Sequence, residues 1–348
     1  MRIERRETPH AVWALAAPFI AIVAALTLCA PLILWHGSPV AEAYGLLVKG
    51  TLGSRGAITE TLSRATPLIL TGLAAAVAFR AKLWNIGGEG QFYVGAIAAA
   101  AIGAGAVVLP AVLLIPFVMV CGAAAGALLL IGPTLLKTRL GVDEVVTTLL
   151  LNFVVLLFVS MMIEGPMKDP LAFGWPQSAP VIDEATLPKL IPKTRLHLGF
   201  LIAVGAAVVF WLIDTRTTWG FEARAVGSNP GAARFAGMSI QGVTLRVAIF
   251  SGALAGLAGA SEVMGLRGYL ALDLSPGFGY SGIVVAMLAQ LHPLGVVAGA
   301  IFVACVFVGA DAMGRTLGVP SFIADVIVAT SLMCMLVAIL AAQYRIRP

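Results

Sequence analysis

Charged side chains are scarce in this 348-residue chain, where Asp, Glu, Lys and Arg make up 11% of the residues. Soluble domains carry about 25%. Hydrophobic residues account for 60%, and the mean hydropathy is +0.99. This composition leaves no room for a separate soluble domain, so we expect a single membrane domain over residues 1–348. The net charge of +5 is distributed between apolar runs rather than gathered on one face, which argues against nucleic-acid binding.

Motifs for nucleotide, metal and acyl-transfer chemistry are also missing. The chain has no G-x-x-x-x-G-K-[ST] sequence, so it cannot bind ATP through a P-loop. Neither G-x-S-x-G nor H-E-x-x-H occurs. The four cysteines stand singly in apolar runs without C-x-x-C spacing, and we interpret them as small core residues. The sequence therefore predicts a protein that is not an enzyme and that needs no cofactor or metal.

Long apolar runs predict an all-α polytopic membrane protein with about ten transmembrane helices, because each span needs about 20 mostly apolar residues. We expect these helices within residues 11–41, 61–79, 90–136 (two helices, with the turn at Pro110 and Pro116), 145–163, 198–213, 243–263, 273–311 (two helices, divided at His292 and Pro293) and 322–342. The segments 276–291 and 293–310 are short for a span. The sequence leaves open whether they cross the membrane, tilt or re-enter.

Cations beside the apolar runs predict that both termini are cytoplasmic, because short cytoplasmic loops carry an excess of Lys and Arg. The residues that carry this signal at the two ends are Arg2, Arg5, Arg6, Arg345 and Arg347. In this orientation the Pro-rich segment 164–197 is an external loop, and the charges from Glu42 to Arg64 bracket another. The polar segment 215–242 is then cytoplasmic.

Segment 215–242 contains a short capped helix. Asn229 is a good N-cap, Pro230 suits the first helical position, and Gly237 is a stop signal, so we expect about two turns between them. An ordinary solvated loop is one interpretation, and a docking helix for a soluble partner is the other. The residues that would form the coupling surface are Arg224, Gly227, Asn229, Pro230, Ala232, Ala233, Arg234 and Phe235.

Polar residues within the apolar runs are candidates for a translocation pathway, since such groups need a partner or water at membrane depth. The candidates are Asn85, Glu89, Gln91, Asn152 and Glu262. Three of them also have a structural interpretation. Glu89 could simply favour a helix N-terminus, Asn152 could form a helix-to-helix hydrogen bond, and Glu262 could reach the membrane interface by its own length.

Glycines predict two further features. Gly252, Gly256 and Ala260 recur every four residues, with Ala255 and Gly259 beside them, which is typical of a face for close helix packing. The segments 88–96 (GEGQFYVGA) and 277–284 (GFGYSGIV) echo each other, with glycines and a tyrosine before an apolar helix. On the topology above they lie on opposite membrane faces, as in a possible inverted repeat.

Four stretches together resemble one family. They are LWNIGGEGQ at 83–91, GVDEVVTTLLLNF at 141–153, RAVGSNPGAARFAGMSI at 224–240 and GFGYSGIVVAMLAQLHPLG at 277–295. They are similar to the permease subunits of bacterial ABC importers for nucleosides and simple sugars, in the branch that works with basic-membrane-protein-type lipoproteins. The first stretch favours the nucleoside branch. The widespread importer pattern E-A-A-x-x-x-G is not fully met, because Arg224 follows Glu222 and Ala223.

The resemblance implies a transporter in the bacterial plasma (inner) membrane with several partners. It implies an ABC ATPase subunit, a second similar permease, and an external substrate-binding lipoprotein or periplasmic protein, with a nucleoside, nucleobase or simple sugar as the solute. The segment at 224–240 would contact the ATPase. The alternative is an ion-coupled secondary transporter, which should have paired intramembrane acids, whereas this sequence has only scattered ones.

Overall fold

The structure is a computed structural model that describes residues 2–5 and 11–347, with side-chain detail for 16–338. Its elements in chain order are β1 (Arg2–Arg5), α1 (Ala11–Trp35), α2 (Val40–Leu52), α3 (Arg55–Arg80), α4 (Gly88–Ala101), η1 (Ile102–Ala106), α5 (Ala111–Leu140), α6 (Glu144–Glu164), η2 (Asp183–Ala185), α7 (Gly199–Arg216), α8 (Thr218–Ser228), α9 (Pro230–Phe235), α10 (Ile240–Glu262), η3 (Val263–Arg267), α11 (Phe278–Leu288), α12 (Pro293–Leu317), α13 (Ile323–Gln343) and β2 (Tyr344–Arg347). Helices dominate, and β1 pairs antiparallel with β2. The predicted all-helical membrane fold is confirmed in this coarse form.

Seven helical segments among the described residues are long and apolar enough to cross a membrane. They are α1 from Ala16, α3, α5, α6, α7, α10 together with η3, and α12. Each falls on one of the ten predicted spans. The other three predicted spans correspond to α4 with 14 residues, α11 with 11, and α13, whose apolar stretch is described over Ile323–Ala338.

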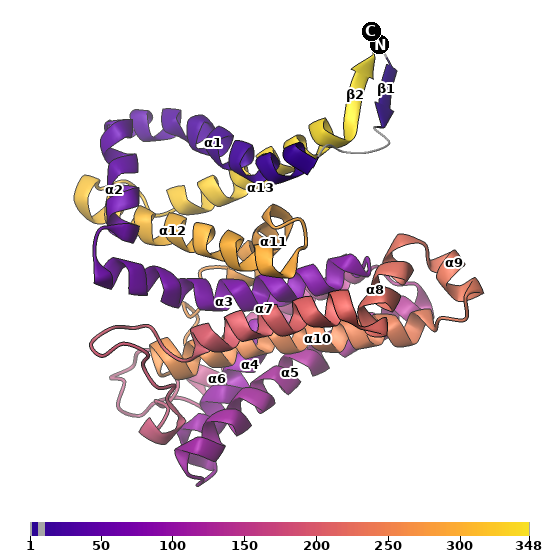
Figure 1. The fold of residues 1–348 in the computed structure, drawn as a ribbon. Coiled ribbons are helices and arrows are strands. Elements are labelled where there is room, and N and C mark those ends of the chain that lie inside the picture. Colours follow the sequence, from indigo (N-terminus) through magenta and orange to yellow (C-terminus); the bar gives the residue numbers. More distant parts are fainter. Residues whose placement is uncertain (1, 6–10, 348) are drawn as a thin grey trace.

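Helix α3 forms the centre of the fold. It begins after Ser54, whose hydroxyl accepts a hydrogen bond from the Ala57 amide at 3.1 Å. Within its apolar 18-residue stretch, 89% of the residues are buried. In Figure 1 it runs through the middle of the molecule, with α11 and α12 on one side and α10 on the other. Gly72 allows this close packing, because a Cβ there would stand 2.8 Å from Val285 and 2.9 Å from Val296. The core is thus built around one almost fully enclosed helix.

The predicted small-residue face of α10 is confirmed. A Cβ on Gly256 would stand 3.0 Å from the Cα of Gly126 on α5, and a Cβ on Gly95 of α4 would stand 2.5 Å from the Cα of Gly256. A Cβ on Gly259 would stand 2.8 Å from the carbonyl carbon of Phe92. These are backbone atoms, which cannot rotate away. Helices α4, α5 and α10 therefore pack through a glycine seam, defined here as Gly95, Gly122, Gly126, Gly252, Gly256 and Gly259.

Several predicted boundaries are wrong. The stretch between Glu42 and Arg64 is not simply a loop, because it contains α2 and the first turns of α3. Pro116 lies inside α5, and the turn before that helix comprises residues 107–110. Helix α12 has 25 residues and continues past Asp311, so it is not short, whereas α11 is. Charge and proline marked the expected ends, but Arg64 and Asp311 lie within helices, where they form a half-buried ion pair at 2.7 Å.

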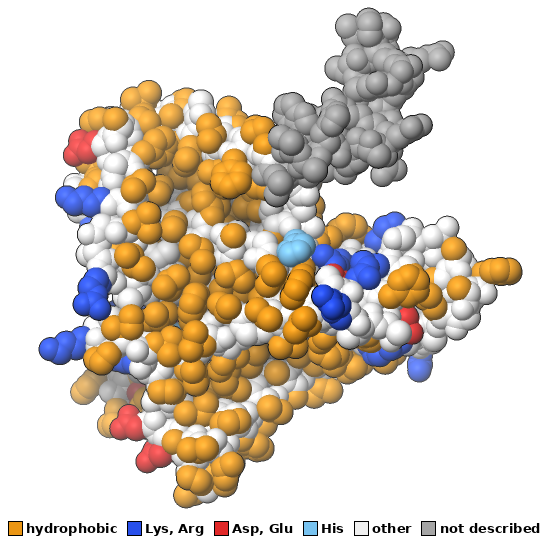
Figure 2. Space-filling view, viewed as in Figure 1, with side chains coloured by type: hydrophobic (Ala, Val, Ile, Leu, Met, Phe, Trp, Pro, Cys, Tyr) orange, Lys and Arg blue, Asp and Glu red, His pale blue; other side chains and the backbone are white. Residues whose placement is uncertain are grey.

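The two ends of the bundle differ. In Figure 1 the segment 165–198 lies at one end, and α8 and α9 project at the other, where β1 and β2 also lie. Figure 2 shows hydrophobic side chains over most of the flank between these ends, whereas Lys and Arg side chains gather at the ends themselves. This distribution suits a bundle whose flank faces lipid and whose ends face water.

Candidate functional site

The beginnings of α4 and α11 meet in the interior. The Gly279 amide donates a hydrogen bond to Oε2 of Glu89 at 2.6 Å, and the Ser275 side chain also hydrogen-bonds Glu89. A Cβ on Gly279 would stand 2.6 Å from the Cα of Glu89, so the contact requires glycine. The two echo segments therefore touch, and the expectation that they lie on opposite faces is wrong. We call this contact the α4–α11 junction.

An amide pair braces the turn before α4. The Asn85 amide nitrogen donates to Gln91 Oε1 at 2.9 Å, and the Gln91 amide nitrogen donates to Asn85 Oδ1 at 2.8 Å. Asn85 also donates to the Ser251 hydroxyl on α10 at 3.0 Å, and that hydroxyl donates to the Ala74 carbonyl on α3 at 2.7 Å. Because both amides are buried, these bonds fix the turn against two core helices.

Asn152 on α6 connects the same turn to α11. Its Oδ1 accepts from the Gly90 amide at 2.8 Å, and its amide nitrogen donates to the Ile86 carbonyl at 3.0 Å and to the Tyr280 hydroxyl at 3.1 Å. The structural interpretation of Asn152, a helix-to-helix hydrogen bond, is thus present. Sequence reasoning missed Tyr280, although the echo segment contained it.

Four of the five pathway candidates therefore belong to one buried network. The exposed fractions of Asn85, Glu89, Gln91 and Asn152 are 3%, 4%, 1% and 0%. Tyr280, at 39% exposure, is the member that reaches the surface. The network can hold the N-termini of α4 and α11 close to the partly exposed Tyr280. A helix N-terminus carries a partial positive charge, so two such charges meet here.

Glu262 lies apart from this network, at the end of α10. It is 3% exposed, and its Oε2 has no hydrogen-bond partner among the described residues. Arg267 and Arg64 supply favourable electrostatic interactions with its charge, whereas Glu60 opposes them. The structure does not bring Glu262 together with Asn85, Glu89, Gln91 or Asn152 by any hydrogen bond between described residues.

His197 lies beside the same end of α10. Its Nδ1 accepts a hydrogen bond from the Gly199 amide at 3.2 Å, and the ring is fully buried against Gly265. Burial lowers the pKa of His197 to about 4, because the charged imidazolium would lose its hydration there. The imidazole is therefore neutral at physiological pH and packs as part of the loop.

The short helix predicted after Asn229 is confirmed as α9. The Asn229 Oδ1 accepts from the Ala232 amide at 3.1 Å, and Pro230 occupies the first turn. The amphipathic helix α8, which the sequence did not predict, precedes it. Phe235 is 97% exposed, and Ala232 and Arg234 are exposed beside it. These three residues belong to α9, which projects from the bundle in Figure 1.

Three of the expected coupling residues, Arg224, Gly227 and Ala233, make contacts within the chain. Arg224 pairs with Asp214 of α7 at 2.9 Å, and Asp214 also pairs with Arg80 at the end of α3. Gly227 lies directly against the Arg80 carbonyl, where a Cβ would stand 3.0 Å from the carbonyl carbon. Ala233 is 3% exposed. Helix α8, which leads into α9, is thus joined to α3 and α7, a connection that the sequence did not reveal.

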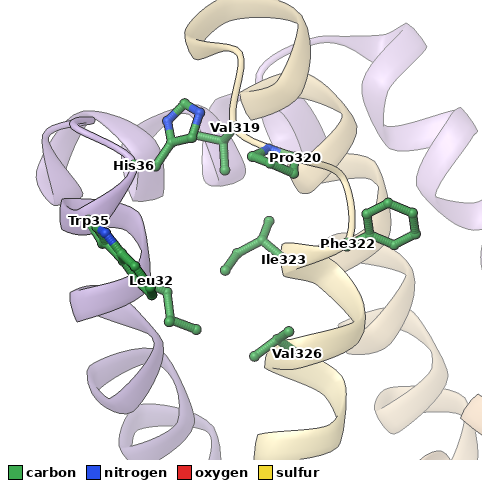
Figure 3. A pocket seen from close by; sticks show the side chains of 8 residues that line it. All are labelled: Leu32, Trp35, His36, Val319, Pro320, Phe322, Ile323 and Val326. Carbon is green, nitrogen blue, oxygen red and sulfur yellow. The ribbon is translucent and has the colours of Figure 1, made fainter.

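A groove of about 360 Å³ opens between α1 and the start of α13. In Figure 3 Leu32, Ile323 and Val326 point into it. The complete lining is Leu32, Trp35, His36, Val319, Pro320, Phe322, Ile323 and Val326. Such an apolar lining offers a polar solute few hydrogen bonds, so the groove is a poor candidate for the solute pathway.

No group of three or more His, Cys, Asp or Glu side chains in the described part of the chain could hold a metal ion.

We expect the hydrogen bond at the α4–α11 junction, rather than the charge of Glu89, to be what transport needs. Glu89→Ala leaves the buried Gly279 amide unpaired, which costs about 1–3 kcal/mol, so uptake should fall about tenfold or more. Glu89→Gln keeps an acceptor and should retain most uptake. The measurement is solute uptake normalised to folded transporter. An equal loss in both variants would instead assign a role to the carboxylate charge.

The family model described as branched-chain amino acid transport system / permease component matches residues 57–342. The chain is 37% identical over 335 residues to the guanosine ABC transporter permease protein NupP of Bacillus subtilis (strain 168), covering 96% of this chain and 94% of NupP. It is 36% identical over 357 residues to the glucose ABC transporter permease protein TsgB13 of Haloferax volcanii, covering 99% and 93%.

A further relative is the nucleoside ABC transporter permease protein NupB of Lactococcus lactis subsp. cremoris (strain MG1363). The chain is 33% identical to it over 320 residues, covering 90% of this chain and 88% of NupB. No solved structure matches the chain. The family match spans most of the sequence, and the relatives are matched over nearly their whole lengths. The chain therefore belongs to the family of branched-chain amino acid transport system permease components, as the permease subunit of an ABC transporter whose ATPase is a separate subunit.

Proposed function

We propose that this chain forms part of the translocation pathway of an ABC importer that carries nucleosides into a bacterial cell. The observation that carries the proposal is the similarity to NupP and NupB, which are named for guanosine and nucleosides, over most of both chains. TsgB13, named for glucose, is almost equally similar. The motif at 83–91 favours the nucleoside branch, and it forms the braced turn beside the α4–α11 junction.

The proposed topology has ten spans with both termini in the cytoplasm. Seven spans have helices of sufficient length, and α4, α11 and α13 would complete the ten. The placement of β1, β2 and α9 at one end of the bundle supports this orientation. Cysteines introduced at Lys189 and Arg234 test it. Impermeant reagents should label the first from outside and the second only from inside, and the reverse pattern would refute the orientation.

The solute pathway is proposed to pass the α4–α11 junction. Two helix N-termini meet there, and Tyr280 gives the junction a half-buried hydroxyl. Asn85, Gln91 and Asn152 would keep this wall rigid, because each is satisfied by hydrogen bonds within the fold. Glu262 would act separately, near the external end of the path.

Partners complete the proposed importer. The whole chain, 1–348, is one permease domain, in which the exposed tip of 215–242 contacts the ABC ATPase and the external loop 164–197 faces the substrate-binding protein. A second, homologous permease would cover part of the lipid-facing flank, where α6 exposes Leu150, Phe153 and Leu157. The bacterial inner membrane is the proposed location. Ion-coupled transport is not favoured, since the relatives are ABC permeases.

Uptake in proteoliposomes tests the function. They would contain this chain, its partner permease and its ATPase, with ATP inside and the substrate-binding protein outside. We expect labelled guanosine to accumulate, excess unlabelled nucleoside to compete and glucose not to compete. An ATPase variant that cannot hydrolyse ATP is the control. Competition by glucose alone would reassign the solute, and uptake that persists with this ATPase variant would refute the ABC mechanism.

A further inference from the structure

The external loop 164–197 carries three exposed apolar side chains that lie close together in the sequence. Leu171, Phe173 and Trp175 are 81%, 104% and 69% exposed. They lie on the turn 169–177, which we call the aromatic knob. Exposure of these side chains forfeits the free energy of burying them, about 1.5–3 kcal/mol for a fully exposed side chain such as Phe173. The knob therefore presents apolar surface that the chain itself leaves uncovered.

Hydrogen bonds hold the aromatic knob in one conformation. The Asp169 side chain accepts from the Leu171 amide at 2.9 Å and from the Gln177 side-chain amide at 3.2 Å. The Asp169 amide donates to the Gln177 carbonyl at 3.0 Å, and the Trp175 amide donates to the Ala172 carbonyl at 2.9 Å. Asp169 is only 8% exposed. The turn is therefore rigid, with a buried carboxylate at its centre.

The backbone at the tip is strained. Phe173 has a φ of 49°, in the left-handed region that residues other than glycine rarely adopt, and Gly174 follows with a φ of 88°. Such strain persists only where surrounding structure imposes it, and it is concentrated at functional positions. Here the strain and the exposure fall on the same side chain. Neither the strain nor the exposure of Phe173 stabilises the isolated chain, which indicates that this side chain contacts another molecule.

The base of the knob is tied to the end of α10. The Ser178 amide donates to the Leu270 carbonyl at 2.9 Å, and the Leu270 amide donates to the Ser178 hydroxyl at 2.9 Å. The Val181 amide donates to the Gly268 carbonyl at 2.7 Å. These bonds connect the knob to residues 268–270, which directly follow η3, the π-helical end of α10. A force applied at the knob would thus reach the core helix that carries the glycine seam.

We propose that the aromatic knob is the contact through which this chain binds the external substrate-binding protein, with Phe173 and Trp175 inserted into an apolar cleft of that protein. The inference rests on the proposed function, because it requires an importer with such a partner. Rigid, preorganised aromatic side chains are typical of residues that dominate protein–protein binding energy. A lipid anchor would need neither a fixed turn nor a buried carboxylate. The knob also lies on the end loop, beyond the flank that a second permease would cover.

The test is the affinity of the assembled transporter, in lipid nanodiscs, for the purified substrate-binding protein encoded with it, prepared without its lipid. We expect Trp175→Ala to raise the dissociation constant about tenfold or more. Phe173→Gly removes the side chain while favouring the left-handed backbone, so it should fold and bind as weakly. Trp35→Ala is the control, since Trp35 is 86% exposed at the end of α1 and lies outside the knob. It should change the affinity less than about twofold.

The outcomes separate the two proposals. If wild-type transporter binds its substrate-binding protein and both knob variants bind equally well, the knob inference is overturned while the importer function stands. If the wild type shows no binding in any nucleotide state, both are overturned. Quenching of Trp175 fluorescence by brominated lipids, without the binding protein present, would identify the knob as a lipid contact and also overturn the inference.

Discussion

Gly259→Leu is expected to abolish the folded transporter. A Cβ at this position would stand 2.8 Å from the carbonyl carbon of Phe92 and 2.9 Å from the backbone nitrogen of Ala96. Both belong to α4, so relief would require the whole helix to move away from α10. Forcing extra side-chain volume into a well-packed core costs about 1–3 kcal/mol, and more where backbone atoms block it. Since total stabilities are about 5–15 kcal/mol, we expect little protein to survive extraction from the membrane.

Gly205→Leu on α7 is the matched control for this seam variant. No atom lies within 4 Å of a Cβ built on Gly205, so the same substitution adds a side chain to open space. Fluorescence-detected size-exclusion chromatography of detergent extracts measures the monodisperse yield of both variants. We expect the Gly205 variant to match the wild type and the Gly259 variant to give at most a trace. Comparable peaks from both would show that α4 and α10 are not in contact through Gly259.

The sequence analysis recognised one side of the glycine seam. The four-residue spacing of Gly252, Gly256 and Ala260 marks a packing face from local sequence alone, because side chains four apart lie on one side of a helix. Gly122 and Gly126 on α5 have the same spacing, and sequence reasoning missed them. That the two faces lie against each other, with Gly95 of α4 beside them, is a tertiary property that periodicity does not contain.

The α4–α11 junction shows a similar limit. The cost of a carboxylate at membrane depth correctly predicted that Glu89 needs a partner. That partner is the amide of Gly279, 190 residues further along the chain. The echo between the two segments indicated a relation, yet topology reasoning placed them on opposite faces. It treated every apolar run as a complete span, whereas α11 has 11 residues and begins in the interior, where Gly279 contacts Glu89.

The coupling element shows which local signals suffice. Asn229 and Pro230 start α9 as predicted, because capping involves only neighbouring residues. Which residues of this element are buried and which are exposed was not predictable. Ala233 was expected to contact a partner, but it is buried, and its carbonyl accepts the Met238 amide at 3.0 Å. Ala233→Arg would therefore damage the element itself, which makes it a poor probe of docking.

Phe235→Ala is expected to uncouple the permease from its ATPase. Phe235 is 97% exposed at the tip of an element joined to α3 and α7 by the Asp214 ion pairs, so displacement of the tip is transmitted to the core. An exposed aromatic side chain on a rigid support is the typical anchor of a protein interface, and its truncation often costs about 2 kcal/mol or more. At about 1.4 kcal/mol per factor of ten, ATPase recruitment should weaken by more than tenfold, and uptake should fall with it.

Phe19→Ala provides the comparison for Phe235→Ala. Phe19 is 73% exposed on α1, outside α8 and α9, so its truncation should leave recruitment unchanged. Co-purification of the ATPase with the permease, measured together with uptake, distinguishes a docking defect from misfolding. If the Phe235 variant recruits and couples the ATPase fully, α9 is not the coupling element. The surface would then lie around residues 80–85 or 137–144, which the Lys137 ammonium links by donating to the Lys82 carbonyl and pairing with Glu144.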